Sequence, residues 1–116
     1  MNKYIQGHPD YIVNSHGQVF KVCPKSIREL NKENSHGHAR VTLDGEKLYV
    51  SSLVMHAFGP PKPDPTYKIF HINGNKWDDD IKNLVWLDKS SIHRYSLYTE
   101  EYRQSYAFRT EVLGTI

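Results

Sequence analysis

The sequence predicts an α+β fold, with β-hairpins in the N-terminal part, a short helix in the middle, another hairpin, and a C-terminal helix. Two observations support this prediction. Runs of alternating apolar and polar residues flank turn-forming residues, and two segments repeat apolar residues at helical spacing. Because the chain has 116 residues, it has room for one modest core. We expect one compact unit made of residues 1–50, 51–93 and 94–116.

The composition excludes several classes of protein. The net charge is only +2, so the charge of the whole chain does not establish a nucleic-acid partner, and a case for DNA depends on local patches. Cys23, the single cysteine, excludes an internal disulfide and a thiolate zinc cluster. The sequence shows neither an apolar signal segment nor a run that could span a bilayer. We expect a soluble cytoplasmic protein with no membrane partner, and the oligomeric state is left open.

Two hairpins are predicted in the N-terminal part, with strands at residues 11–13, 19–22, 39–43 and 47–50. The first pair is joined by Asn14-Ser15-His16-Gly17, whose residues tolerate the positive φ of a tight turn. The second pair is joined by Asp44-Gly45, a strong signal for a two-residue hairpin turn. Residues 24–37 show no alternation between these hairpins, and we expect a polar, mildly basic loop there.

The middle and C-terminal segments predict a helix, a third hairpin and a final helix. Residues 51–58 carry apolar residues at helical spacing behind a serine cap, and a Gly-Pro-Pro sequence ends this helix. After a stiff proline-rich connector, residues 67–72 and 83–87 read as two paired strands, with a turn at Asn73-Gly74. Asp88 or Ser90 then caps the final helix.

The final helix carries an aromatic stripe on one face. Its members are Ile92, Tyr95, Tyr98, Tyr102 and Tyr106. A stripe of this kind must pack against something. Docking on the domain's own sheet is the favoured interpretation, and the alternative is an interaction surface for a partner protein, because aromatic residues serve in both places.

His71 and Asn83 are the candidate catalytic residues, one on each strand of the third hairpin. Phosphodiester hydrolysis needs an activated water and a divalent ion that neutralises charge on the phosphate. A histidine can take the proton from water, because its unperturbed pKa lies near neutrality. An asparagine on the facing strand can accept the Nδ1 proton and hold the ring so that Nε2 points at the water.

The surrounding sequence resembles the HNH endonucleases of phages and mobile introns, the homing endonuclease-like type. In that family a helix reading roughly H-R-L-V-A-x-A-F-x-P precedes N-H-x-D-G-N-x-x-N-N and then N-L-x-W. The corresponding segments here are Ser51–Pro60, Phe70–Asp79 and Asn83–Trp86. Residues 5–19, IQGHPDYIVNSHGQV, are similar to the small module that often precedes this nuclease core, I-x-G-x-x-x-Y-x-V-S-N-x-G-x-V. Together the two resemblances run from Tyr4 to His93.

The resemblance implies an architecture and a partner. Residues 1–50 would form a DNA-binding-like module of β-hairpins, and residues 51–93 a ββα-metal (HNH-type) core. Residues 94–116 would form the C-terminal helix and tail. The implied partner is double-stranded DNA, and the implied setting is a phage-encoded protein in a bacterial cell.

The sequence departs from the family at the positions that usually bind metal. The residue before the general-base histidine is normally Asp, Asn or His, and here it is Phe70. The second ligand position, in the following helix, is Ile92. Since Mg²⁺ demands oxygen ligands, no cofactor is expected and the favoured interpretation is a catalytically degenerate site. Ser51 and Ser52 replace the family's His and Arg, which removes positive charge near where a phosphate would lie.

Compensation is the opposing interpretation. If the nuclease is active, Asp88 and His93 would supply ligands for Mg²⁺ or Mn²⁺. Asp78, Asp79 and Asp80 could add carboxylates, but a solvated acidic turn is the favoured interpretation of these three.

Three function hypotheses follow. The first is a catalytically degenerate, HNH endonuclease-like DNA-binding protein that grips phosphates through basic residues. The residues proposed to bind DNA are Lys21, Lys25, Arg28, Lys32, Arg40, Lys76 and Lys82. The second is an active, metal-dependent DNA nicking endonuclease. The third is a phage-encoded interaction protein that reuses the scaffold and binds a host protein through the tyrosine stripe.

Overall fold

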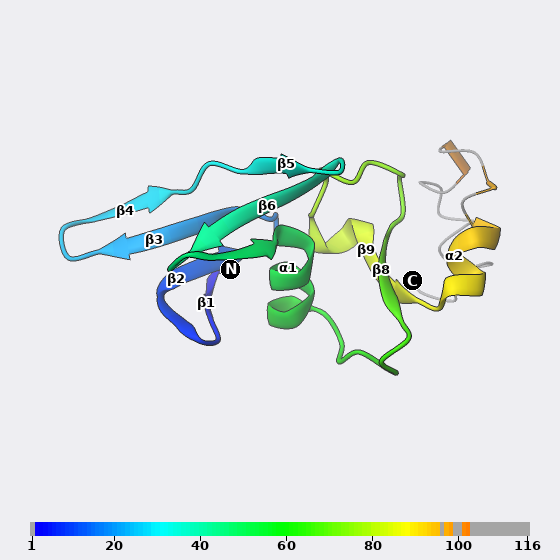
Figure 1. The fold of residues 1–116 in the computed structure, drawn as a ribbon, viewed down its shortest axis with the longest axis horizontal. Helices are drawn as coiled ribbons and strands as arrows, with labels where there is room; N and C mark the ends of the chain where they lie inside the picture. Colours follow the sequence, from blue (N-terminus) through cyan, green and yellow to red (C-terminus); the bar gives the residue numbers. More distant parts are fainter. Residues whose placement is uncertain (1, 96, 99–100, 103–116) are drawn as a thin grey trace.

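The structure is a computed structural model that describes residues 2–95, 97–98 and 101–102. Its elements are shown in Figure 1. They are β1 (Asn2–Ile5), β2 (His8–Asn14), β3 (Val19–Cys23), β4 (Ser26–Glu29), β5 (Glu33–Ser35), β6 (His38–Leu43), β7 (Glu46–Tyr49), α1 (Val50–Phe58), β8 (Lys68–His71), the 3₁₀ helix η1 (Ile81–Asn83), β9 (Leu84–Leu87) and α2 (Lys89–Tyr95). The predicted α+β class is confirmed: the strands form three antiparallel sheets, in the orders β1-β2-β3-β4, β5-β6-β7 and β8-β9.

All three predicted hairpins are present. Strand β2 pairs with β3, β6 with β7, and β8 with β9. The turns lie at the turn-forming residues of the sequence: Gly17, Gly45 and Gly74 have positive φ angles of 86°, 84° and 80°. Turn chemistry therefore located the hairpins correctly.

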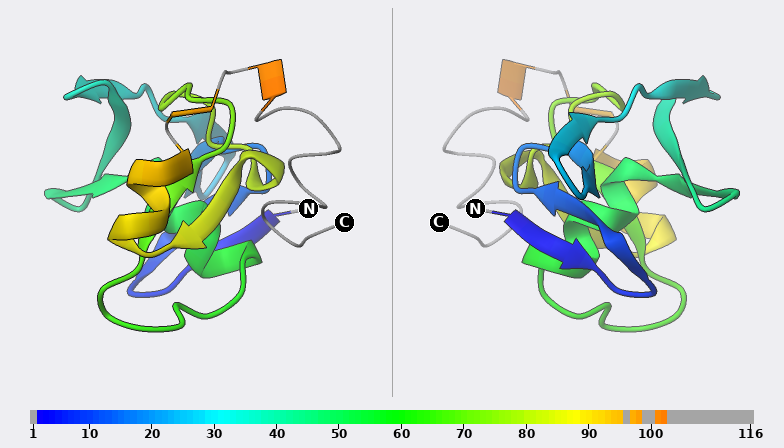
Figure 2. Two further views of the ribbon diagram at one scale, coloured as in Figure 1. Left: turned by 90° about the vertical axis from the view of Figure 1, so that its right-hand side faces the viewer. Right: turned by 90° about the vertical axis from the view of Figure 1, so that its left-hand side faces the viewer.

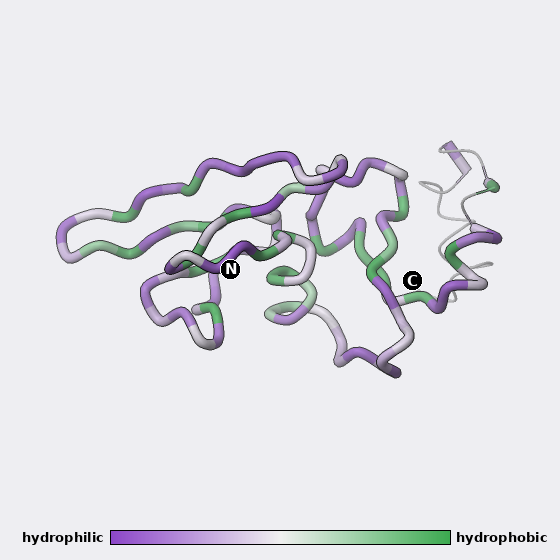
Figure 3. The backbone as a smooth tube through the Cα atoms, in the orientation of Figure 1, coloured by the Kyte–Doolittle hydropathy of each residue, from purple (hydrophilic) through white to green (hydrophobic). Residues whose placement is uncertain are grey.

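The expectation of a loop over residues 24–37 is wrong. This segment contains β4, which pairs with β3, and β5, which pairs with β6. Every residue of β4 is exposed, so the strand has no buried face to impose the apolar alternation by which strands are recognised. Figure 3 shows that β5 and the segment before it are largely hydrophilic. Strand β1 was also not predicted, and three of its four residues are exposed for the same reason.

Helix α1 is confirmed, but its predicted serine cap is wrong. The N-cap residue is Tyr49, and no side chain makes a capping hydrogen bond there. Ser51 and Ser52 lie inside the first turn instead. The helix begins directly after β7, so the preceding strand sets the cap residue.

The main core is shared between the N-terminal sheets and α1. Buried side chains from β2, β3 and β6, including Val13, Val19 and Val41, pack in one cluster with Val54 of the helix. The same cluster reaches Leu84 of β9. The molecule is elongated, with extents of 47 × 25 × 25 Å, and the two end-on views of Figure 2 show the N-terminal strands and α2 at opposite ends. Among the described residues, no helix has the length and apolar character needed to cross a membrane.

A second, smaller cluster joins the β8–β9 hairpin to the C-terminal segment. Phe70 and Ile72 are its buried members, and Ile92, Tyr95 and Tyr102 pack against them. The tyrosine stripe thus docks in part on the chain's own hairpin, which is the interpretation that the sequence favoured. Tyr98 is 38% exposed, and Tyr106 lies outside the described residues.

Candidate functional site

His71 occupies the last position of β8, where it forms a buried pair with Asp79. Its Nε2 lies 2.8 Å from Oδ1 of Asp79. His71 is 6% exposed and Asp79 is 3% exposed. Successive strand residues point to opposite faces of a hairpin. Phe70 accordingly packs toward the C-terminal segment, while His71 faces the loop that contains Asp78, Asp79 and Asp80, called the acidic loop below. The atom that was expected to aim at a nucleophilic water is therefore hydrogen-bonded inside the protein.

The prediction of a solvated acidic turn is wrong for Asp79. The backbone amide of Ile81 donates to the carbonyl of Ser15 at 2.8 Å, and Gly17 lies so close that an added Cβ would be 3.1 Å from Cβ of Asp79. These contacts draw the loop against the N-terminal hairpin and bury the carboxylate. Its second oxygen, Oδ2, is buried and has no hydrogen-bond partner within the described part of the chain. A sequence of three adjacent aspartates gives no signal that one of them is internal.

The loop is also held by its third aspartate. Oδ2 of Asp80 lies 2.8 Å from Nδ1 of His16, and Oδ1 accepts from the backbone amide of Lys82. Burial works to raise the pKa of Asp80, but the hydrogen bonds from His16 and Lys82 outweigh it and lower the pKa below its usual value. The acidic loop thus connects the N-terminal module to the β8–β9 hairpin.

Asn83 has a different role from the one predicted. Its side-chain oxygen accepts from the backbone amide of Asn73 at 2.9 Å. Its side-chain nitrogen donates to the Asn73 side chain and to the carbonyl of Asp78, both at 2.9 Å. Asn83 therefore holds the 73–78 turn in shape, and the orienting partner of the His71 ring is Asp79. The sequence missed this because a carboxylate eight residues downstream carries no local pairing signal.

A second histidine lies beside the buried pair. The ring of His38, on β6, is centred 5.7 Å from that of His71. Partial burial, followed by electrostatic interactions with His71 and Lys76, lowers the pKa of His38 below its usual value. This shift favours the neutral ring, in which either nitrogen can be the donor.

The two metal-ligand positions of the family resemblance do not fit a metal ion. Phe70 is 7% exposed, and Ile92 packs against the small apolar cluster that Phe70 forms with Ile72. The Phe70 ring also lies edge-on to that of Tyr95, with centroids 6.4 Å apart. Neither position offers a lone pair, whereas Mg²⁺ requires near-octahedral oxygen donors.

The compensating residues do not assemble a site either. Asp88 caps α2: its Oδ1 accepts from the backbone amide of Ser91 at 2.7 Å. Hydrogen bonds from the Ser91 side chain and backbone lower the pKa of Asp88. His93 is exposed on α2. Within residues 2–95, 97–98 and 101–102, no group of three or more His, Cys, Asp or Glu side chains is placed to hold a metal ion.

The residues predicted to bind DNA are spread along the molecule. Lys25 and Arg28 are exposed on the β3–β4 hairpin, and Lys21 lies directly opposite Arg28. Arg40 forms an ion pair with Glu33, in which Nε lies 2.8 Å from Oε1. Lys32 is half-buried between β4 and β5, and Lys76 and Lys82 are exposed near the acidic loop. The structure brings Lys21, Lys25 and Arg28 together, and the other members lie elsewhere.

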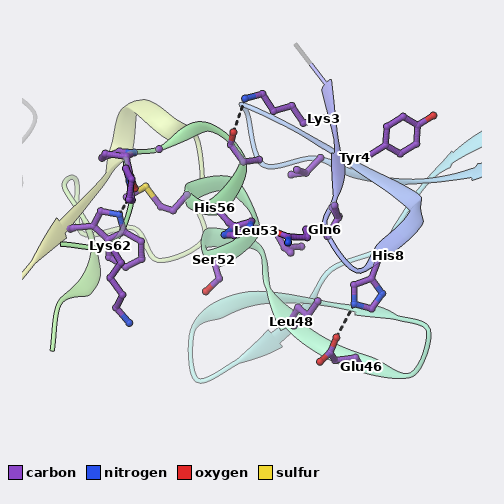
Figure 4. Close-up of a pocket in the computed structure, with 18 residues that line it drawn as sticks. Lys3, Tyr4, Gln6, His8, Glu46, Leu48, Ser52, Leu53, His56 and Lys62 are labelled. Atoms are coloured by element: carbon purple, nitrogen blue, oxygen red, sulfur yellow. Dashed lines mark hydrogen bonds and ion pairs between the residues drawn. The ribbon is translucent and has the colours of Figure 1, made fainter. Parts of the chain in front are cut away.

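Two cavities lie next to α1. The larger, of about 790 Å³, is bounded by the β1–β2 hairpin and the helix, and Figure 4 shows its lining. It does not include His71 or Asp79. The smaller, of about 410 Å³, lies at the start of the helix and is lined by His38, Ser51, Lys62 and Lys68 among others. The sequence missed these two lysines because they lie in the proline-rich connector and on β8.

Comparisons with known proteins support the resemblance. Residues 49–94 match the model of the family described as HNH endonuclease. The structure is similar to a solved structure described as "DNA binding and cleavage by the HNH homing endonuclease I-HmuI", with a TM-score of 0.68, 22% sequence identity, and coverage of 98% of this chain and 68% of that chain. None of the curated proteins matches the chain. The HNH homing endonuclease-like resemblance and the HNH-type fold are thereby confirmed.

Proposed function

We propose that this HNH endonuclease-like chain is a DNA-binding protein whose nuclease site is catalytically degenerate, of phage or mobile-element type. The premise is the match of residues 49–94 to HNH endonucleases. The observation that carries the proposal is that Phe70 and Ile92, at the two positions where the family resemblance implies metal ligands, are both part of one apolar cluster. The scaffold is retained, while the donors that would hold a divalent ion are replaced.

The environment of His71 supports the same conclusion. A general base must lie within hydrogen-bond reach of the proton that it abstracts. The Nε2 atom of His71 is instead 2.8 Å from Asp79, and both side chains are buried. This pair stabilises the loop against the hairpin, so its retention is explained by folding alone.

Binding to the phosphates of double-stranded DNA is supported by the β3–β4 hairpin. Lys21 and Arg28 face each other across the two strands, and like charges placed directly opposite destabilise a sheet. A bound phosphate relieves this repulsion. Lys25 is exposed at the connecting turn, so the end of the hairpin presents a cationic edge. Each such residue that contacts a phosphate adds affinity that falls as salt rises.

An electrophoretic shift assay tests the DNA-binding part of the proposal. The full chain should retard a DNA duplex at about 50 mM salt and lose affinity steeply by about 200 mM. The double variant Lys25→Gln/Arg28→Gln should reduce the slope of log affinity against log salt by about 2. Lys89→Gln, which removes one exposed charge at the start of α2, is the control and should leave the slope unchanged. The absence of any shift at low salt would refute DNA binding.

An active nicking endonuclease is the alternative, because His71 and Asn83 of the family pattern are both present. A supercoiled plasmid incubated with Mg²⁺ or Mn²⁺ distinguishes the two functions. We expect the plasmid to remain supercoiled. Nicking that depends on the metal and is abolished by His71→Ala would overturn the degenerate site.

A further inference from the structure

We propose that the larger cavity beside α1 is a binding site for a small organic anion, a molecule with an apolar ring system and one acidic group. The cavity measures about 790 Å³, within the range of about 300–1,000 Å³ typical of small-ligand sites. None of the residues predicted to bind DNA lines it. The proposal therefore goes beyond DNA binding and does not depend on it.

The walls of the cavity are mainly apolar and come from segments that are distant in the sequence. Strands β1, β2, β7 and β9, helix α1 and the proline-rich connector all contribute. A wall of this kind favours a ligand with an apolar body, because the ligand then removes apolar surface from water on both sides of the contact. The chief apolar lining residues are Ile5, Val13, Leu48, Leu53, Met55 and Trp86.

Hydrogen bonds hold these walls in place. Nε1 of Trp86 donates to the carbonyl of Pro60 at 2.9 Å, which ties the indole ring to the connector. Nε2 of His56 lies 2.9 Å from Oε1 of Gln6, which joins α1 to the turn between β1 and β2. All four residues line the cavity. Because the walls are already ordered, a ligand loses little binding free energy to ordering them.

The charges around the cavity favour an anion. The only carboxylate among its described lining residues is that of Glu46. Its Oε1 lies 2.8 Å from Nε2 of His8, a contact shown in Figure 4. Hydrogen bonds to Asp44 and Glu46 raise the pKa of His8, and this shift favours the protonated ring, which offsets the charge of Glu46. The other charged lining residues are both cationic, Lys3 and Lys62.

Lys62 is placed to receive the acidic group of the ligand. Its Nζ lies 5.6 Å from the ring centroid of Trp86, so a cation and an apolar ring adjoin at one wall. A ligand that packs beside the indole can set its acidic group against this ammonium. The Nζ of Lys3 instead donates to the carbonyl of Ala57 at 2.8 Å, as Figure 4 shows, and holds the end of α1.

A matched pair of fluorescent probes tests the site in the full-length chain. Anilinonaphthalene sulfonate has an apolar ring system and one acidic group, and phenylnaphthylamine has the same rings without the charge. The chain should bind the sulfonate saturably at a single site, and the neutral probe about fivefold more weakly. Equal affinities would refute the selection of an anion, and the absence of saturable binding would refute the site.

A charge variant tests the role of Lys62. Lys62 is exposed in the connector, so Lys62→Gln should leave the fold intact. It should weaken binding of the sulfonate about fivefold and leave binding of the neutral probe unchanged. Lys89→Gln, which removes one exposed charge on α2, is the control and should change neither. Equal weakening by the two variants would show that the sulfonate responds only to the charge of the whole chain, and would overturn the assignment.

A blocking variant tests the position of the site. Ser52 is exposed on α1 and lines the cavity, so Ser52→Phe adds a ring at its edge. Both probes should bind about tenfold more weakly, because the added ring competes for the same space. Ser90→Phe, at an exposed serine of α2, is the matched control and should leave both affinities unchanged. Unchanged binding in a folded Ser52→Phe variant would contradict the location.

A measurement on the wild-type chain keeps the test decisive if a variant fails to fold. In the ¹⁵N-labelled protein, the sulfonate should shift the backbone amide signals of Leu48 and Leu53, which line the larger cavity and not the smaller one. Tyr67 and Ile69, which line only the smaller of these two cavities, should shift less. Larger shifts at Tyr67 and Ile69 would place the probe in the other cavity and overturn the proposal.

Discussion

At the scale of single residues, the structure redistributes the roles that the sequence suggests. His71 is in the predicted strand, but its Nε2 is hydrogen-bonded to Asp79 at 2.8 Å and is not directed at a water. The Asn83 side chain is hydrogen-bonded to Asn73 and Asp78 in the turn. The residues that look catalytic thus hold a loop and a turn. Asp79, which the sequence places on the surface, is the most deeply buried of the three acidic loop residues.

The first prediction concerns the buried pair. His71→Ala leaves the Asp79 carboxylate buried without its hydrogen-bond partner, which should lower the free energy of unfolding by about 3–5 kcal/mol. His56→Ala, at an exposed histidine on α1 whose Nε2 lies 2.9 Å from the Gln6 side chain, is the control and should cost about 1 kcal/mol. Urea unfolding measures both values.

A double-mutant cycle identifies the cause of this loss. The variant His71→Ala/Asp79→Ala should be more stable than the sum of the single losses implies, by about 1–3 kcal/mol. Additive losses, or a His71→Ala variant as stable as His56→Ala, would show that the 2.8 Å contact contributes nothing.

At the scale of elements, the acidic loop is packed against the turn between β2 and β3. Three contacts define this junction: Ile81 to Ser15, Asp80 to His16, and the close approach of Gly17 to Asp79. Gly17 has φ +86°, a conformation that disfavours any side chain. The turn therefore needs glycine for its backbone and also for the space that the loop occupies.

The second prediction separates these two requirements. Gly7 has φ +82° with nothing within 4 Å of an added Cβ, so Gly7→Ala should cost only the conformational penalty, about 1 kcal/mol. Gly17→Ala should cost about 1–3 kcal/mol more, because its Cβ would meet Asp79 at 3.1 Å. Urea unfolding of both variants gives the comparison. Equal losses would mean that the loop moves aside at no cost.

The third prediction concerns the contact between the β1–β2 and β6–β7 hairpins. His8 places its Nδ1 3.1 Å from Asp44 and its Nε2 2.8 Å from Glu46, and Figure 4 shows the second contact. The hydrogen bond to Asp44, followed by that to Glu46, raises the pKa of His8 above 6.5. Both contacts can be donated only by the protonated ring.

A group whose pKa is raised on folding stabilises the fold at low pH. The contribution of His8 should therefore be complete below its unfolded pKa of 6.5 and be lost as pH rises through the folded value. Urea unfolding at about pH 6 and about pH 8.5 should show a larger loss of stability in the wild-type chain than in His8→Gln. The same loss in both proteins would contradict the prediction.

At the scale of the whole molecule, the N-terminal sheets and the HNH-like segment share one core. Val13, Val19 and Val41 from the first half pack with Val54 and Leu84 from the second. The acidic loop adds a second connection between the halves. The predicted division at residue 50 therefore marks a change in type of element, and the packing is continuous across it.

The fourth prediction follows from this shared core. Both tryptophans, Trp77 and Trp86, lie in the second half of the chain, whereas most strands lie in the first. Unfolding followed by tryptophan fluorescence and by far-UV circular dichroism should give the same midpoint, with an m-value in urea of about 1–3 kcal/mol/M. Separate midpoints would show that the halves unfold independently.

The sequence by itself determined the local elements and the resemblance. Turn residues such as Asp44-Gly45 and Asn73-Gly74 specify the hairpins because their backbone conformation is a local property. The resemblance rests on residue types at fixed spacing, and it identified Phe70 and Ile92 as departures. Prediction of strands from the sequence pattern failed at β1 and β4, because their mostly exposed residues show no alternation of apolar and polar side chains.

Only the tertiary structure decided what the polar residues do. The partner of His71 depends on a loop that is buried by contacts with Ser15 and Gly17, more than fifty residues earlier in the chain. The smaller cavity beside α1 likewise joins Lys62 and Lys68 to His38 and the first turn of α1. Hydrogen bonding and charge depend on distances in space, which the order of residues does not give.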